Sequence, residues 1–257
     1  MVTLTSPLGW VGGKFKMTNI LLPIIQAHPH TTYVEPFAGG ASVFFKKQPS
    51  TKEVLNDINP DLIEFYRKTQ KKAESCLVYN TPEEYQTARQ NVESGTWTAC
   101  DFIRYNKNTF AGNMKNFGLI TDCNHQDGSC HISKYNQTYS LIEQRLKNVK
   151  LHNQDYQEMI QTYDSPDTFF YADPPYDVTS SKYYQHTNLS AVSPEKIAEN
   201  FSNIQGKVLI TFNDSPRVRQ AFEKYGYHMK NIALTYSANN NFARKPKNEL
   251  LITNFKT

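Results

Sequence analysis

One stretch of the chain, Thr168–Tyr176, reads TFFYADPPY. Its first five residues form a short, mostly apolar run, which predicts a buried strand. Pro174 and Pro175 have no backbone N–H to donate, so they end sheet pairing and stiffen the turn that follows. A stiff turn holds the Asp173 carboxylate, a peptide carbonyl and the Tyr176 ring in a fixed relation. Two acceptors beside an aromatic ring suit a planar base with an exocyclic amino group, and an Asp-Pro turn with a core tyrosine is the plainer alternative.

Strands and helices alternate on both sides of this stretch. The apolar patterns predict strands at 32–35, 53–56, 149–152 and 207–212, with two later strands near Ile232 and Leu250. They predict helices at 14–27, 41–45, 60–77, 155–161 and 215–225, and one that opens at Ser193-Pro194. This alternation predicts an α/β fold with a doubly wound mixed sheet. Ligands bind at the carboxyl ends of strands in such sheets, where Asp173 and residues 37–40 both fall.

The middle of the chain carries a different pattern. Helical periodicity at 82–92, 99–108 and 134–146 flanks a polar stretch, and strand patterns are missing there. We therefore expect an inserted, mainly helical domain over 61–147, which divides the α/β domain into segments 1–60 and 148–257.

Length and composition narrow the class of protein. A chain of 257 residues with 39% hydrophobic residues can form one large domain with an insertion. Its apolar runs are far shorter than the roughly 20 residues needed to cross a bilayer. The N-terminus lacks the pattern of a signal peptide, so we expect a soluble, cytoplasmic protein without a membrane partner. A net charge of +4 permits a nucleic-acid partner without requiring one.

The four cysteines show no C-x-x-C spacing, and a chain of this length does not need disulfides. Free thiols are therefore expected. One cluster could in principle hold zinc, but its spacing matches no common zinc motif, so no metal is predicted. That cluster consists of Cys123, His125, Cys130 and His131.

A second constellation suits a nucleoside-containing cofactor. Gly39-Gly40 lets the backbone turn tightly and approach a ligand. Asp57 lies 22 residues beyond Glu35 at the end of the next predicted strand, where an acid reaches ribose hydroxyls. Neither G-x-G-x-x-G nor a P-loop is present, so a phosphate-cradling loop is not expected. Trp10 and Lys14 add an aromatic ring and a cation, with a packed tryptophan and a surface lysine as the alternative.

Four motifs occur together in one order: WVGGK (Trp10–Lys14), VEPFAGG (Val34–Gly40), NDIN (Asn56–Asn59) and DPPY (Asp173–Tyr176). In this order they resemble the Dam-type, α-group (D12 class) site-specific DNA N6-adenine methyltransferases. The resemblance implies a class I, Rossmann-like fold that binds S-adenosylmethionine. It implies that segments 1–60 and 148–257 form the catalytic domain and that 61–147 recognises the target. It further implies a bacterial or phage-encoded enzyme, monomeric in solution, with association on double-stranded DNA left open.

The same resemblance assigns residues to the cofactor site. These are Trp10, Lys14, Glu35, Phe37, Ala38, Gly39, Gly40, Asp57, Asp155, Tyr156 and Asp173. For catalysis it implies Asp173, Pro174 and Tyr176. Hydrogen bonds from adenine N6 to the Asp173 carboxylate and the Pro174 carbonyl would expose the N6 lone pair for direct, in-line attack on the methyl group. The base must leave the duplex to reach this site, and Tyr176 would stack on it.

DNA contacts are expected in two polar segments. The first, Arg104–Asn116, supplies Arg104, Asn106, Lys107, Asn108, Phe110, Asn113 and Lys115; the second supplies Arg244 and Lys245. Solvated polar loops are the alternative for both. The first segment departs from the run typical of GATC-methylating relatives, which leaves the recognition sequence open. Thr211-Phe212 replaces a typical serine-asparagine, a change expected to touch the chemistry little.

Three other functions remain to be weighed against this one. An RNA adenine methyltransferase would use the same DPPY turn. A catalytically silent DNA- or cofactor-binding module would have no need of Asp57 and Asp173. A cytosine N4 enzyme usually carries serine where Asp173 stands, and the lack of a Pro-Cys pair disfavours cytosine C5 chemistry.

Overall fold

The structure is a computed structural model that describes residues 4–72, 76, 81–109, 112–118, 134–176, 192–234 and 247–256. The chain divides into two compact units. The helical unit comprises Met1–Pro23, Gly39–Pro49 and Asn59–Asn153, and the sheet unit comprises Ile24–Ala38, Ser50–Ile58 and Gln154–Thr257. This division groups residues 1–23 and 39–49 with the helices, so it differs from the boundaries predicted from sequence. The role of 61–147 in target recognition stays a prediction.

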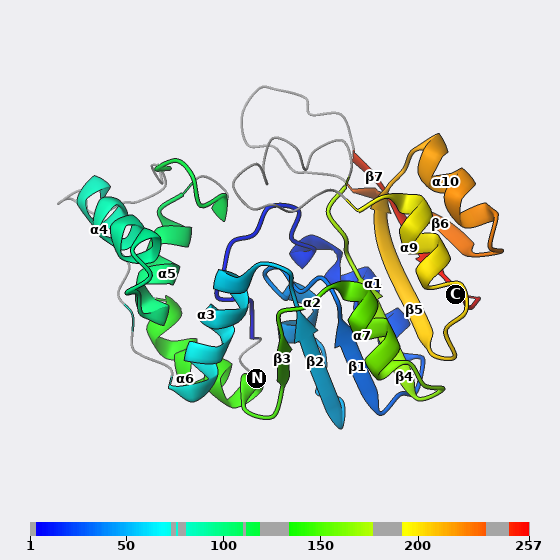
Figure 1. The fold of residues 1–257 in the computed structure, drawn as a ribbon, viewed down its shortest axis with the longest axis horizontal. Helices are drawn as coiled ribbons and strands as arrows, with labels where there is room; N and C mark the ends of the chain where they lie inside the picture. The colour runs from blue at the N-terminus through cyan, green and yellow to red at the C-terminus, as the bar shows by residue number, and fades with distance from the viewer. Residues whose placement is uncertain are drawn as a thin grey trace. The chain divides into compact units, whose positions relative to one another are not determined.

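Seven strands form one sheet in the order β3-β2-β1-β4-β5-β7-β6 (Figure 1). Their bounds are β1 Thr32–Glu35, β2 Lys52–Asn56, β3 Lys150–His152, β4 Thr168–Ala172, β5 Lys207–Asn213, β6 His228–Leu234 and β7 Lys247–Thr253. β1 runs parallel to β2 and β4, and β4 runs parallel to β5. β7 is antiparallel to both β5 and β6. The predicted doubly wound mixed sheet is confirmed.

The central strand is β4, and all five of its residues are buried. Phe170 pairs with Val34 on one side and with Val208 on the other. A strand that has parallel neighbours on both sides and is covered on both faces needs a continuous apolar run, which the sequence supplies. The carboxyl end of β4 therefore delivers Asp173 to the edge where parallel sheets bind ligands.

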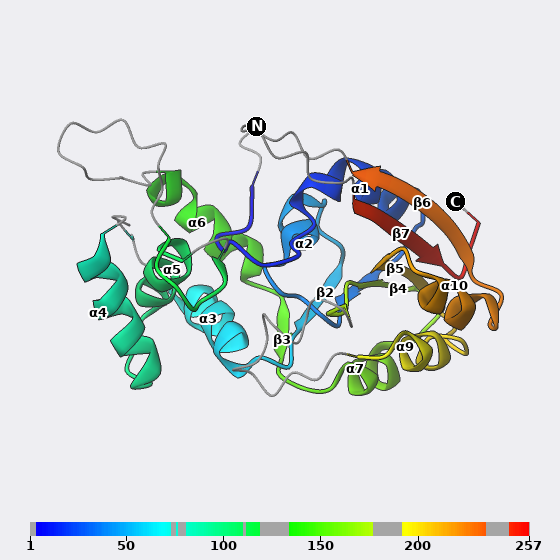
Figure 2. The same cartoon turned by 90° about the horizontal axis from the view of Figure 1, so that it is seen from above.

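Three helices cover one face of the strands in the sheet unit (Figure 2). They are α7 (Tyr156–Tyr163), α9 (Pro194–Asn200) and α10 (Pro216–Glu223). Met159, Ile197 and Phe222 from these helices are fully buried in a common core with the strands. α9 and α10 begin alike: a serine hydroxyl accepts a hydrogen bond from a first-turn N–H, and a proline follows at the first helical position. This Ser-Pro pattern satisfies one otherwise unpaired N–H and presets the helical φ.

The helical unit is built around α3 (Pro60–Lys71), α4 (Pro82–Glu93), α5 (Ala99–Lys107) and α6 (Lys134–Leu146). It also contains η1 (Phe15–Met17), α2 (Ser42–Lys46) and the start of α1 (Thr18–Gln26). Phe102 of α5 is buried and stacks on Phe65 of α3 with 5.1 Å between ring centroids. Trp97 packs on the Phe102 ring, with 5.2 Å between ring centroids. α3 ends at Lys71, six residues before the predicted end of that helix.

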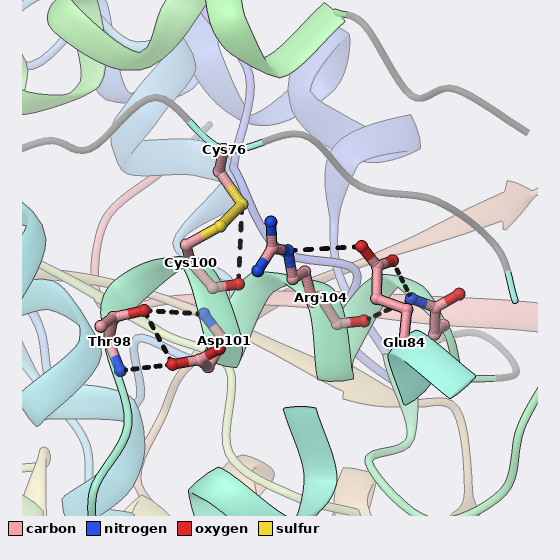
Figure 3. Close-up of a disulfide and its surroundings, with 7 residues drawn as sticks. Cys76, Glu84, Thr98, Cys100, Asp101 and Arg104 are labelled. Carbon is pink, nitrogen blue, oxygen red and sulfur yellow. Dashed lines mark hydrogen bonds and ion pairs between the residues drawn. A yellow bond between two sulfur atoms is a disulfide. The ribbon is translucent and has the colours of Figure 1, made fainter. Parts of the chain in front are cut away.

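A disulfide joins Cys76 to Cys100, the second residue of α5 (Figure 3). Their Cα atoms lie 5.4 Å apart. A capping box fixes the start of α5, because the Thr98 hydroxyl accepts from the Asp101 N–H and the Asp101 carboxylate accepts from the Thr98 N–H. The prediction of free thiols is wrong for this pair, since folding brings together two cysteines that are 24 residues apart.

Reduction of this disulfide is expected to lower the free energy of unfolding. Closing a loop of this length removes entropy from the unfolded chain worth about 3 kcal/mol. Thermal unfolding with and without dithiothreitol should show a drop in Tm for the wild type. The Cys76→Ser/Cys100→Ser double variant should have the same Tm as the wild type in dithiothreitol, and its Tm should not change when the reductant is added. Peptide mapping that finds both thiols alkylated in the unreduced protein would contradict the pairing.

Two further features concern only the described part of the chain. It holds no helix with both the length and the apolar character to cross a membrane. Among the same described residues, no cluster of three or more His, Cys, Asp or Glu side chains is arranged to hold a metal ion. The cluster weighed for zinc, Cys123 to His131, lies outside the described residues.

Candidate active site

The Asp173 carboxylate is held by the neighbouring strand. Thr211 of β5 is fully buried, and its hydroxyl donates a 2.7 Å hydrogen bond to Asp173 Oδ1. The Tyr171 hydroxyl lies 3.4 Å from Thr211 Oγ1. Because the single Thr211 proton goes to the carboxylate, Tyr171 is the donor in that second bond. Burial, followed by the Asp173 charge, raises the pKa of Tyr171 well above its ordinary value, so it keeps this proton.

Tyr176 is fixed at both ends of its side chain. Its hydroxyl donates to Glu249 Oε2 at 2.6 Å. Its ring stacks on Phe212, with centroids 5.4 Å apart and planes inclined by 25°. Burial of the phenol, with the Asp173 and Glu249 charges, raises the pKa of Tyr176 well above its ordinary value. Tyr176 is therefore a neutral hydrogen-bond donor at physiological pH.

One buried amide organises the loop after β1. Asn56 Nδ2 donates to the Pro36 carbonyl at 2.9 Å and to the Gln154 carbonyl at 3.0 Å, and Asn56 Oδ1 accepts from the Gln154 N–H. The Asn56 backbone carbonyl accepts from the Ala38 N–H at 2.8 Å. Asp57, the predicted ribose ligand, directly follows this anchor. Sequence reasoning gave Asn56 no role, although an amide at the end of a strand just before an acid was a signal.

The remaining predicted cofactor residues of the sheet unit are structurally engaged. Glu35 is buried and accepts from the Tyr33 hydroxyl at 2.8 Å. Burial and this carboxylate raise the pKa of Tyr33 well above its ordinary value. Tyr156 is buried against Phe37, with ring centroids 5.0 Å apart, so it supports the loop that carries Phe37. Asp155 accepts from the Gln157 N–H as the N-cap of α7.

In the helical unit, Trp10 packs over the Gly39-Gly40 turn. A Cβ on Gly39 would lie 2.9 Å from Trp10 Cδ1, and one on Gly40 would lie 3.0 Å from Trp10 Cβ. Gly39 also has a φ of +48°, which favours glycine. The Tyr66 hydroxyl donates to the Gly39 carbonyl at 2.8 Å and fixes the turn. Lys14 is buried, and its ammonium donates to the Gly12 carbonyl at 2.9 Å.

Two of the predicted DNA contacts have structural roles instead. Asn106 is fully buried; its amide donates to the Gly9 carbonyl and accepts from the Gly9 N–H, both at 2.9 Å. Asn108 is also fully buried and donates to Glu84, which pairs with Arg104 at 3.3 Å (Figure 3). We therefore correct the prediction that these two amides read base edges, because burial and their partners give them a structural function.

The other predicted contacts differ in their surroundings. Arg104, Lys107, Asn113 and Lys115 are partly exposed. Although part of the Lys107 residue is exposed, the desolvation of its ammonium group lowers the pKa of Lys107 to about 8. The Asn113 side chain accepts from the Lys115 N–H at 3.0 Å and so shapes the turn that carries them. Phe110, Arg244 and Lys245 lie outside the described residues.

Some of the residues predicted for the cofactor site have groups that suit S-adenosylmethionine by their chemistry. In the helical unit, the Trp10 side chain fills the space that a Cβ on Gly39 or Gly40 would need, so the glycines let this side chain lie directly on the backbone of the turn. In the sheet unit, the Asp57 and Asp173 carboxylates suit the ribose hydroxyls and the amino group of such a molecule. These two carboxylates would help to hold the cofactor, which supplies an electrophilic methyl group when bound.

The chain is similar to known proteins over most of its length. A model of the D12 class N6 adenine-specific DNA methyltransferases matches residues 10–237. The chain is 25% identical over 249 residues to the DNA N-6-adenine-methyltransferase of Escherichia phage P1, covering 86% of this chain and 31% of that protein. It is 23% identical over 273 residues to the type II methyltransferase M1.LlaDCHI of Lactococcus lactis subsp. cremoris, covering 96% and 94%. It is 25% identical over 271 residues to the DNA adenine methylase of Salmonella typhi, covering 95% and 93%.

Proposed function

The chain belongs to the D12 class of N6 adenine-specific DNA methyltransferases, and from this premise we propose how it selects and methylates its base. As a member of this family it transfers a methyl group from S-adenosylmethionine to adenine N6 in DNA. We propose that it is site-specific and acts on an adenine turned out of the duplex. The observation that supports this best is the Asp173 carboxylate, held by Thr211 at the mouth of the central strand.

Adenine N6 is a weak nucleophile, because its lone pair is delocalised into the ring. The Asp173 carboxylate and the Pro174 carbonyl can accept one N6 hydrogen bond each, which draws electron density back onto the nitrogen. Thr211 fixes one oxygen of the carboxylate before the base arrives, so little reorganisation is needed. The Asp173 carboxylate can also accept the proton that N6 loses on methylation. The methyl transfer is then a direct, in-line substitution without a covalent enzyme intermediate.

We propose that the helical unit recognises the target sequence. Arg104, Lys107, Asn113 and Lys115 provide partly exposed cations and one amide for the DNA backbone and base edges. Because its pKa is about 8, Lys107 is mostly protonated at neutral pH. A DNA phosphate beside it would stabilise the charge further. The proposal extends to Phe110, Arg244 and Lys245. The enzyme would act where the DNA is, in the cytoplasm of a bacterial or phage-infected cell.

Mapping methylated adenines in DNA from a host without its own adenine methylation tests the proposal. Cells that express the wild type should carry N6-methyladenine within one short sequence motif. The purified enzyme should methylate duplex DNA of that sequence and leave RNA of the same sequence unmodified. Equal transfer to RNA would favour an RNA enzyme. A folded protein that binds S-adenosylmethionine but methylates neither would favour a silent binding module.

A further inference from the structure

A buried carboxylate on β7, the last strand in chain order, has no role in the chemistry described so far. Glu249 lies on β7, where it pairs in register with Asn213 of β5 and Ile232 of β6. Its exposed fraction is 7%. Burying a carboxylate is unfavourable unless hydrogen bonds compensate for the lost water. Glu249 accepts a 2.6 Å hydrogen bond from the Tyr176 hydroxyl, a short, charge-assisted bond.

Tyr176 has two carboxylates within reach but only one proton. Glu249 Oε2 is 2.6 Å from its hydroxyl, whereas Asp173 Oδ1 is 3.5 Å away. The proton therefore goes to Glu249, while Asp173 Oδ1 accepts the proton of Thr211. Removal of the Glu249 carboxylate would leave the Tyr176 hydroxyl within 3.5 Å of Asp173 Oδ1, which can then accept its proton.

We propose that Glu249 is a positioning residue for methyl transfer. It holds the Tyr176 ring against Phe212 and directs the phenol proton away from the carboxylate that must engage the adenine amine. In this role Glu249 acts through the Tyr176 hydroxyl. This inference rests on the proposed function, and it extends the DPPY turn to a partner 73 residues further along the chain.

A double-mutant cycle tests the coupling between the two side chains. The variants are Glu249→Leu, Tyr176→Phe and both together. Methyl transfer is measured with radiolabelled S-adenosylmethionine on genomic DNA from a strain that lacks adenine methylation. Glu249→Leu should lower kcat about tenfold, as expected when one acceptor of a charged hydrogen bond is lost. In the Tyr176→Phe background the same substitution should change kcat less than twofold, because the hydroxyl through which Glu249 acts is already gone.

Two further variants separate positioning from folding. Glu249→Gln keeps an acceptor oxygen of the same size and should restore most of the activity. Asn248→Ala changes an exposed neighbour on the same strand and should leave kcat and Tm as in the wild type. The Kd for S-adenosylmethionine should stay within about twofold in all variants if the cofactor site is intact.

Each outcome decides a separate point. Full activity in Glu249→Leu would overturn the inference. An equal loss in the wild-type and Tyr176→Phe backgrounds would also overturn it, because Glu249 would then act without the hydroxyl. If the loss of activity parallels a fall in Tm and Glu249→Gln does not restore it, Glu249 has only a structural role and the inference is overturned. A wild type without activity on any DNA would instead overturn the proposed function.

Discussion

Asp173→Ala is expected to lower kcat for methyl transfer at least a thousandfold. In the proposed mechanism, the substitution removes an acceptor for adenine N6, the acceptor for its departing proton and a carboxylate predicted for the cofactor site at once. Loss of one preorganised polar group at a reacting atom alone typically costs about a hundredfold to a thousandfold. Single-turnover transfer on duplex DNA, with the enzyme in excess, measures this directly. Turnover within tenfold of the wild type would show that the Asp173 turn is not the catalytic centre.

Thr211 supplies the matched control. Thr211→Val keeps the shape of the side chain and the Asp173 carboxylate but removes the 2.7 Å hydrogen bond that orients it. The expected loss is about tenfold in kcat, since one neutral donor to a charged group is worth about 1.5 kcal/mol or somewhat more. Thr211→Ser restores the hydroxyl and should recover most of the rate. Equal losses in Thr211→Val and Asp173→Ala would mean that orientation, rather than the carboxylate itself, limits the reaction.

Asn106→Ala is expected to destabilise the helical unit by about 3 kcal/mol or more. The substitution leaves both the N–H and the carbonyl of Gly9 without the partner they have in the structure, and each unsatisfied group costs about 1–3 kcal/mol. It also leaves a cavity at a fully buried position. Gly9 directly precedes Trp10, so the affinity for S-adenosylmethionine should fall as well. Urea unfolding and calorimetric titration of the cofactor measure the two effects.

Two companion variants define what the Asn106 result means. Gly112→Ala should be at least as damaging, because its Cβ would overlap the Gly9 carbonyl at a φ of +70°. Asn113→Ala alters a partly exposed amide on the same segment and should change the free energy of unfolding by less than about 1 kcal/mol. A stable Asn106→Ala protein with unchanged cofactor affinity and weakened DNA binding would restore the base contact predicted from sequence.

The parts of the site that follow from local sequence were predictable. The apolar run of β4 and the two prolines after Ala172 set the strand, its end and the place of Asp173 without reference to the rest of the chain. Ser193-Pro194 marked a helix start for the same reason. The loop after β1 was equally local, because its two glycines follow the end of the strand within a few residues.

Other parts depend on which segments fold together. Thr211 and Glu249 meet the DPPY turn only because β5 and β7 are neighbours in the sheet, and no spacing in the chain encodes that pairing. Asn106 and Asn108 sit in a polar run whose composition is that of a solvated loop, and only tertiary packing buries them. The Cys76–Cys100 pair was missed likewise, since its approach depends on how the helices pack.

The position of β7 has a consequence for how the protein is made. β7 follows β6 in the chain but lies between β5 and β6 in the sheet. In a growing chain that has emerged only as far as β6, that strand therefore lacks the neighbour with which it pairs in the folded sheet. The Tyr176 hydroxyl must also wait for a partner synthesised 73 residues later. We expect the proposed catalytic centre to be among the last parts of the protein to fold during translation. Fragments that end before residue 249 should therefore not methylate DNA.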